Sequence, residues 1–342
     1  RDTDRSRGLG DVYKRQRCDE YTYDSDDGIK ITIALKLYQQ NSFDFIINQW
    51  WPVVFLSPLR SFFNAKIISV HHTALYTRSV IEGFCLKSTL KRVFFLLYRF
   101  FEKERQLSVI DKLLIFSDKV LFLSPQFKDQ YIQLRNPKSV EKLDWCYNPL
   151  VFDNFISMDE ICKKRKEVLF VGRLLESNKK ISKLLTIWKH IQLDKEFNEW
   201  HLYIVGDGKD KSFYLDFTRN NNIPNVHFEG RRYPIPYYKR ASIFAMTSAF
   251  EGFPMSIIEA QQNGVVPIVM DSFLSVHDII DNDVNGVLIS YGNTTMFAES
   301  LKSLMKDEMQ RNKLAIKGLE TCRRFNIETV VDRWEEIFEK MR

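Results

Sequence analysis

Residues 251–269 read EGFPMSIIEAQQNGVVPIV, and this stretch contains the pattern that decides the fold. Ser242–Met246 precedes it and Val265–Met270 closes it, and both are short apolar runs of the kind that parallel sheets bury. Pro254–Asn263, between them, has the composition of a helix that begins at proline, a residue tolerated at the first helical position. Strand, loop, helix and strand in this order predict one unit of a parallel α/β sheet.

The same alternation of apolar runs and amphipathic segments continues on both sides of this unit. The runs that we interpret as further buried strands are 44–48, 65–70, 119–123, 167–171, 200–205, 225–228 and 286–289. Apolar residues at helical spacing, among them Ile181, Leu184 and Trp188, predict an amphipathic helix after the run 167–171. The chain is therefore predicted to be an α/β protein with parallel sheets.

A turn signal at Asn148-Pro149 marks the predicted domain boundary. We expect residues 17–150 to form an N-terminal domain and residues 151–325 a C-terminal domain, with a final helix at 326–342 packed back on the first. Residues 1–16 show neither helical nor strand periodicity and resemble translated adaptor or cloning sequence. An ordinary disordered basic arm is the alternative.

The composition excludes several classes of protein. With 342 residues, 44% hydrophobic and 27% charged, the chain is long and apolar enough for two folded domains. A net charge of +6 is too small and too dispersed to indicate nucleic-acid binding. The five cysteines form no CxxC pair, and no long apolar run or signal peptide is visible. We therefore expect a cytoplasmic protein with reduced thiols.

Glycine, polar and charged residues follow three of the predicted strands in the C-terminal half. They are Gly172, Arg173, Lys179, Lys180, Gly206, Asp207, Gly208, Ser248, Glu251 and Gly252. Ligands of parallel α/β sheets bind at the carboxyl ends of the strands, at the point where the strand order reverses. We therefore expect these loops to face one binding site.

The residue types suit a sugar nucleotide. Arginine and lysine supply positive charge for a diphosphate, while Gly172 and Gly252 allow the backbone to approach a ligand. The helix that opens at Pro254 presents free N–H groups and the positive end of its dipole. Glu259 only accepts hydrogen bonds when ionised, which suits the paired hydroxyls of a ribose, and Glu251 could hold a sugar hydroxyl.

Each feature also has an ordinary explanation when it is taken alone. Gly172-Arg173 could be a turn with a surface cation, Lys179-Lys180 a solvated helix start, and Gly206-Asp207-Gly208 a tight turn. The residues after Gly208 do not complete a GxGxxG motif, so a dinucleotide site is only weakly indicated. The occurrence of all of them in order, each at a strand end, favours a single site.

This ordered set resembles the retaining family 4, or group 1, glycosyltransferases of the GT-B fold. The segments that carry the resemblance are FVGRLLESNKK (170–180), LYIVGDG (202–208), VHFEGR (226–231), EGFPMSIIEAQQNGVVPIV (251–269) and DNDVNGVLI (281–289). The most specific part is the pair of glutamates eight residues apart, with GFP after the first. The resemblance implies two Rossmann-like parallel-sheet domains that face a cleft, the first of them incomplete.

For the donor site, the resemblance implies specific roles. Arg173 and Lys179 hold the diphosphate, with Lys180 as the alternative if the register differs by one. Glu251 contacts the donor sugar near the reacting carbon, and Glu259 binds the ribose. The remaining donor-binding residues that it implies are Gly172, Gly206, Gly208, Gly252, Phe253, Met255 and Ser256.

In the N-terminal domain, the resemblance assigns a catalytic position to His72, within VHHTA, beside the donor sugar. Its neighbour His71 is the rival for this role. A strand-end histidine whose hydrogen bonds are satisfied within the fold is the structural alternative for either residue.

Two departures from the family pattern stand out. Such enzymes open with a strand and a glycine-rich loop that nothing before Asp44 supplies, so we expect an N-terminally truncated chain that lacks at least one strand–helix unit of about 30 residues. In addition, Lys180 stands where the family often has Gly or Arg after the motif lysine.

The function that we expect is transfer of a sugar from a nucleotide diphosphate sugar to a hydroxyl of a glycan or lipid-linked glycan. The resemblance implies retention of configuration and a role in bacterial surface polysaccharide biosynthesis. Two alternatives remain: a GT-B-like sugar-nucleotide epimerase, and a non-catalytic fragment that binds sugar nucleotides.

Metal ions and cofactors are not expected. Two DxD sequences could in principle bind a metal. The first, at residues 24–26, lies in a segment without a clear structural pattern, and the second, at 281–283, has the composition of a turn. Cationic side chains already supply the charge for a diphosphate.

Residues 86–105 are basic and aromatic. They could rest on the anionic inner face of a membrane, or pack on the core with a solvated basic face.

Overall fold

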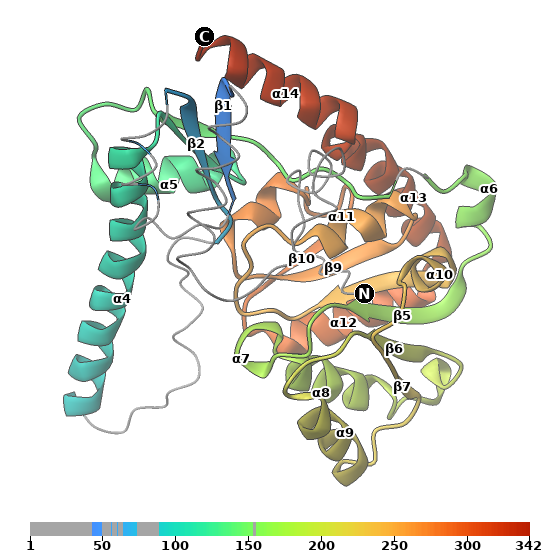
Figure 1. Ribbon diagram of the computed structural model, residues 1–342. Helices are drawn as coiled ribbons and strands as arrows, with labels where there is room; N and C mark the ends of the chain where they lie inside the picture. Colours follow the sequence, from blue (N-terminus) through green and yellow to red (C-terminus); the bar gives the residue numbers. More distant parts are fainter. Residues whose placement is uncertain (1–42, 50–55, 57–59, 61–63, 74–88, 153–154) are drawn as a thin grey trace. The chain divides into compact units, whose positions relative to one another are not determined.

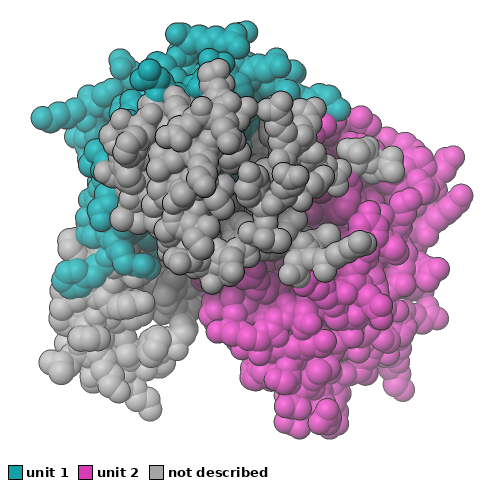
Figure 2. Space-filling view, viewed as in Figure 1, with its two compact units in different colours: residues 1–76, 86–149, 328–342 teal, residues 77–85, 150–327 magenta. Residues whose placement is uncertain are grey.

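The computed structural model describes residues 43–49, 56, 60, 64–73, 89–152 and 155–342. The adaptor-like segment at 1–16 and the DxD sequence at 24–26 lie outside these residues. The chain divides into two compact units, coloured separately in Figure 2. One comprises residues 1–76, 86–149 and 328–342, and the other residues 77–85 and 150–327.

The described residues of the N-terminal unit form a sheet of four parallel strands in the order β1-β2-β3-β4. The described elements of this unit are β1 (Phe45–Asn48), β2 (Lys66–His71), α4 (Thr89–Phe116), β3 (Lys119–Phe122), α5 (Pro125–Arg135), β4 (Leu143–Trp145) and α14 (Ile327–Glu339). Three of these strands lie where apolar runs predicted them, whereas β4 was not predicted. Among the described helices, none is both long and apolar enough to cross a membrane.

The final helix, α14, is attached to the N-terminal unit by charged and aromatic contacts. The Arg333 side chain donates to the carboxylate of Asp144 and to the backbone oxygen of Trp145, the latter at 3.3 Å. The Arg333 guanidinium also lies over the Trp145 ring, and the rings of Phe45 and Phe338 lie 4.7 Å apart. These contacts connect the chain end to β1 and β4.

The C-terminal unit contains six parallel strands in the order β10-β9-β8-β5-β6-β7. Its strands are β5 (Arg165–Val171), β6 (His201–Val205), β7 (Val226–Gly230), β8 (Ala241–Met246), β9 (Val266–Asp271) and β10 (Val287–Ser290). Its α-helices are α6 (Met158–Ile161), α7 (Glu176–Lys179), α8 (Ile181–Ile191), α9 (Lys211–Asn220), α10 (Ile235–Arg240), α11 (Met255–Gln262), α12 (Thr294–Lys306) and α13 (Glu308–Thr321). Short 3-10 turns lie at Lys195–Phe197, Leu274–Asp278 and Cys322–Phe325.

This strand order is that of a doubly wound sheet. The chain moves outward from β5 through β6 to β7, crosses back to β8 on the other side of β5, and continues to β9 and β10. The order therefore reverses between β5 and β8, which is where such sheets bind ligands. Together with the parallel sheet of the N-terminal unit, this confirms the predicted class of two Rossmann-like parallel-sheet domains.

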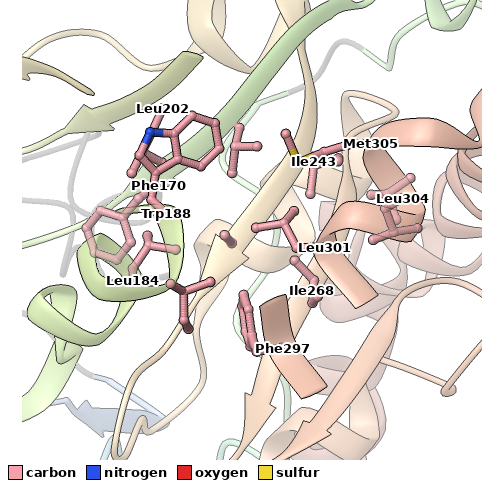
Figure 3. Packing of buried hydrophobic residues seen from close by; sticks show 14 of the residues in the cluster. Phe170, Leu184, Trp188, Leu202, Ile243, Ile268, Phe297, Leu301, Leu304 and Met305 are labelled. Carbon is pink, nitrogen blue, oxygen red and sulfur yellow. The ribbon is translucent and has the colours of Figure 1, made fainter. Parts of the chain in front are cut away.

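Helices cover both faces of the six-stranded sheet, with α8, α9 and α12 on one side and α10 and α11 on the other (Figure 1). On the first side, Trp188 packs against side chains of β5 and β6, as Figure 3 shows. The Trp188 indole also donates to the backbone oxygen of Pro224 at 3.0 Å. Burial of such a side chain stabilises the fold by about 3 kcal/mol or more, since truncating a core Trp costs that much.

Gly206, at the end of β6, allows two backbone segments to touch. It adopts φ +149°, and a Cβ atom there would lie 1.8 Å from the backbone oxygen of Gly172. We therefore expect Gly206→Ala to lower the free energy of unfolding by about 3 kcal/mol or more, because backbone cannot move aside as a side chain can. Urea unfolding followed by tryptophan fluorescence measures this.

Gly230→Ala is the matched control. Gly230 also has positive φ, at +70°, but a Cβ there would meet only the end of the Lys211 side chain at 3.6 Å. Its loss should be about 1–2 kcal/mol, from the backbone conformation alone. Equal losses in the two variants would show that the contact between residues 206 and 172 does not constrain the fold.

Candidate functional site

The loops that follow β5 and β8 are joined to each other at the point where the strand order reverses. The backbone N–H of Ala249 donates to the oxygen of Asn178 at 2.7 Å, and the Thr247 hydroxyl donates to the oxygen of Lys180 at 3.0 Å. Lys180 has φ +50°, so the chain turns there between α7 and α8. These bonds hold α7 against the exit of β8, which places the residues of both loops side by side.

The loop after β5 also packs on the loop after β6. The N–H groups of Gly172 and Leu174 donate to the oxygens of Val205 and Asp207 at 3.0 and 2.9 Å. A Cβ atom on Gly208 would lie 2.3 Å from the backbone oxygen of Leu174. Gly206 and Gly208 were predicted to bind the donor, but the contact that demands glycine at both positions is with the neighbouring loop.

Lys179 and Glu251 form an ion pair between these loops. The Nζ–Oε1 distance is 2.6 Å, and the two side chains are only 13% and 9% exposed. The two residues are 72 positions apart in the sequence. A pair so shielded from water interacts more strongly than one on the surface. The structure thus brings together the lysine and the glutamate that were predicted to bind the diphosphate and the sugar.

The amino end of α11, which follows Glu251 in the sequence, offers backbone hydrogen-bond donors. Its cap residue, Pro254, makes no side-chain cap, and Met255 and Ser256 form the first turn. The Ser275 hydroxyl donates to the oxygen of Gly252 at 2.6 Å, which ties the preceding loop to the turn after β9. The first N–H groups of a helix have no intrahelical partner, so this end favours an anion.

Glu259 lies one turn further along α11 and is buried. The hydroxyl of Tyr238, a fully buried residue of α10, donates to Glu259 Oε2 at 2.8 Å and lies 3.2 Å from the oxygen of Ser256. Tyr238 was not among the predicted site residues, because no local pattern relates it to a helix that begins 17 positions later. It holds the Glu259 carboxylate in a defined orientation.

The other predicted residues differ in their surroundings. Arg173 is exposed, and its guanidinium has no hydrogen-bond or ion-pair partner among the described residues. Phe253 is 8% exposed and its ring packs edge-on against Phe325 at 5.7 Å. The Phe253 ring is therefore part of the core. Only the backbone of Phe253 is left to contact a ligand. Gly252, Met255 and Ser256 are partly exposed.

His72 and His71 lie in the other unit, at the end of β2. His72 Nε2 hydrogen-bonds the Gln49 side-chain oxygen, and His71 Nε2 lies 3.0 Å from the Thr73 hydroxyl. Burial lowers the pKa of both histidines to about 4, so both are neutral at pH 7. These hydrogen bonds are those expected of strand-end histidines that are satisfied within the fold. They do not test the catalytic role of His72, which stays a prediction.

Among the described residues, no group of three His, Cys, Asp or Glu side chains is arranged to hold a metal ion. The motif at 281–283 forms a turn, in which Asn282 Oδ1 accepts from the N–H of Leu288 and Asp283 has φ +60°.

The C-terminal unit matches a known family along nearly its whole length. Residues 153–321 fit the family described as glycosyl transferases group 1. These residues belong to the group 1 glycosyltransferases. The prediction of a group 1 glycosyltransferase is thereby confirmed for these residues, whereas family 4 and retention of configuration stay predictions. The loops described above are those of a group 1 glycosyltransferase domain.

Individual relatives support the same assignment. The amylovoran biosynthesis glycosyltransferase AmsD of Erwinia amylovora is 30% identical over 186 residues, 52% of this chain and 50% of that protein. The lipopolysaccharide 1,6-galactosyltransferase of Salmonella typhimurium is 28% identical over 217 residues, 61% of this chain and 58% of that protein. The chain thus spans about half the length of the curated relatives that it matches.

Solved structures show the same fold. The crystal structure of Anabaena Alr3699/HepE in complex with UDP-glucose superposes with a TM-score of 0.72 at 17% identity, covering 97% of this chain and 89% of that one. At this identity the likeness shows the fold alone, and that fold is GT-B.

Tyr238→Phe removes one hydroxyl and leaves Glu259 buried without that donor. We expect the free energy of unfolding to fall by about 2 kcal/mol, the usual size for a hydrogen bond to a charged group. Urea unfolding at pH 7 measures it. Tyr237→Phe is the control, because the Tyr237 hydroxyl donates to Glu229 at 2.7 Å from a partly exposed position. A loss no larger than that of Tyr237→Phe would contradict the proposed role of Tyr238.

Proposed function

We propose that this protein is a glycosyltransferase that moves a sugar from a nucleotide diphosphate sugar to a hydroxyl of a glycan or lipid-linked glycan. One observation carries the proposal: at the point where the strand order reverses, Lys179 and Glu251 are in contact across the two loops, and the uncapped end of α11 follows. Membership of the group 1 family supports it.

In this proposal each charged group of the site binds a different part of the donor. Lys179, the exposed guanidinium of Arg173 and the first N–H groups of α11 hold the diphosphate and stabilise the charge that develops on it as the sugar leaves. Glu251 accepts hydrogen bonds from the sugar, and Glu259, oriented by Tyr238, accepts them from the ribose. Fixed charges in a site shielded from water act strongly because they need little reorganisation.

The proposal also covers the acceptor and the stereochemistry of the transfer. The names of the relatives refer to amylovoran and lipopolysaccharide, which supports a role in bacterial surface polysaccharide assembly. We propose retention of configuration, on the resemblance to retaining enzymes. We also propose that the C-terminal unit binds the donor and that the N-terminal unit serves the acceptor side, with His72 at the donor sugar.

A panel of UDP-, GDP-, ADP- and dTDP-sugars, scored by thermal shift, tests donor binding. We expect one nucleotide to raise the melting temperature, because ligand that binds only the folded state stabilises it by about 3 kcal/mol at 100 times Kd. Arg173→Ala and Glu259→Ala should each weaken binding of that donor tenfold or more by calorimetry, since each removes a charged contact. Lys166→Ala, at an exposed ion pair near the start of β5, is the control.

The proposed site is wrong if both variants bind the donor as tightly as the unaltered protein. If the donor binds but no acceptor receives the sugar, the chain binds sugar nucleotides without transferring them.

Contact with a membrane surface is a further part of the proposal, and α4 supports it. Phe101, Arg105, Val109 and Lys112 lie at helical spacing and are exposed, so that apolar and basic side chains share one face. We expect sedimentation with vesicles that contain 30% phosphatidylglycerol, and a severalfold loss of it in Phe101→Ser/Arg105→Ser, because each basic residue contributes about 1 kcal/mol near an anionic surface. Equal sedimentation with neutral vesicles would contradict this.

A further inference from the structure

The Lys179–Glu251 ion pair joins the two residues that hold different parts of the donor. Lys179 is assigned to the diphosphate and Glu251 to the sugar, yet in the structure they bind each other at 2.6 Å. No other ion pair of either residue occurs among the described residues. A ligand that takes up either side chain must therefore compete with this contact.

Because the pair is buried, separating Lys179 from Glu251 is costly unless a ligand gives each of the two side chains a new partner. Lys179 is 13% exposed and Glu251 9% exposed. Removing one partner of a buried ion pair leaves the other as an uncompensated charge, which is strongly destabilising. A nucleoside diphosphate offers phosphate oxygens to Lys179 but nothing to Glu251. A nucleotide sugar offers both the phosphate oxygens and sugar hydroxyls that can donate to the carboxylate.

The backbone of the two loops is held in place, so only the side chains of Lys179 and Glu251 can exchange each other for a ligand. The bonds from Ala249 to Asn178 and from Thr247 to Lys180 hold the two backbone segments together. At Gly172, an added Cβ atom would lie in ordinary van der Waals contact with Lys179 Cε, at 3.5 Å. The exchange therefore requires the lysine side chain to rotate from the carboxylate towards a ligand while the backbone stays in place.

We propose that the Lys179–Glu251 ion pair makes the donor site selective for the intact nucleotide sugar over the nucleoside diphosphate. This inference rests on the proposed donor site. The intact donor replaces both halves of the pair, whereas the diphosphate alone replaces one half and isolates Glu251. After transfer, loss of the sugar lets Glu251 recapture Lys179, which weakens the hold on the diphosphate product and favours its release.

Glu251→Gln separates the two effects, because it keeps the shape of the side chain and removes its charge. UDP, GDP, ADP and dTDP, and their glucose conjugates, are titrated by calorimetry into the unaltered protein and into the variant. With the nucleotide that binds the unaltered protein, we expect the diphosphate to bind the variant about tenfold more tightly, the size of one charge-assisted hydrogen bond. The conjugate should gain less or lose affinity, because a sugar contact weakens.

A second pair of variants identifies the cause of any gain. In a Lys179→Met background, Glu251→Gln should no longer tighten diphosphate binding, since there is no ammonium to release. An equal gain in that background would overturn the proposal, because it would show simple repulsion between Glu251 and the phosphates. Glu199→Gln, which breaks the exposed ion pair with Lys166, should leave both affinities unchanged.

The outcomes separate this inference from the proposed function. If no diphosphate and no conjugate binds the unaltered protein, the donor site itself is wrong. If they bind, and Glu251→Gln leaves the ratio of the two affinities unchanged, the donor site stands and the selectivity proposal is overturned. Thermal unfolding checks that each variant is folded, and Glu251→Ala tests the same exchange if Glu251→Gln does not yield folded protein.

Discussion

The parallel pairing of β5 with β8 is the constraint on which the rest of the C-terminal unit depends. Val168 pairs with Ile243 and Leu169 with Phe244, although 75 residues separate the members of each pair. Because parallel neighbours end at the same edge of the sheet, this pairing places the loop at 172–180 beside the loop at 247–254. The burial of apolar strands thus determines where a small number of charged side chains meet.

Those charges are held by partners that the fold supplies. Glu251 is paired with Lys179, and the Glu259 carboxylate accepts from the buried Tyr238 hydroxyl. Buried carboxylates without such partners would be costly, so each buried charge in the site requires a neighbour in the absence of a ligand. The same contacts set the orientations that a ligand meets, which is how the stability of the fold and the chemistry of the site are connected.

The sequence predicts the strands of the C-terminal unit well, because fully buried parallel strands are continuous apolar runs with distinct boundaries. The three-residue β4, LDW, carries too short an apolar pattern to be recognised. Strand-end residues of the site were also predictable, since their type and position follow from the alternation of strands and loops. What could not be predicted is contact: the Lys179–Glu251 pair depends on the sheet order, and the hydrogen bond from Tyr238 on the packing of α10 against α11. Phe253 shows the converse, because a motif residue predicted at the ligand has its ring in the core.

A crystal structure of this chain with a bound nucleoside diphosphate tests the central claim most directly. The account predicts the phosphates between Arg173, Lys179 and the first turn of α11, with the ribose hydroxyls at Glu259 and with Lys179 moved from Glu251 towards a phosphate oxygen. A nucleotide bound away from the ends of β5 and β8, or one that leaves Arg173, Lys179 and Glu259 without contact, would contradict it.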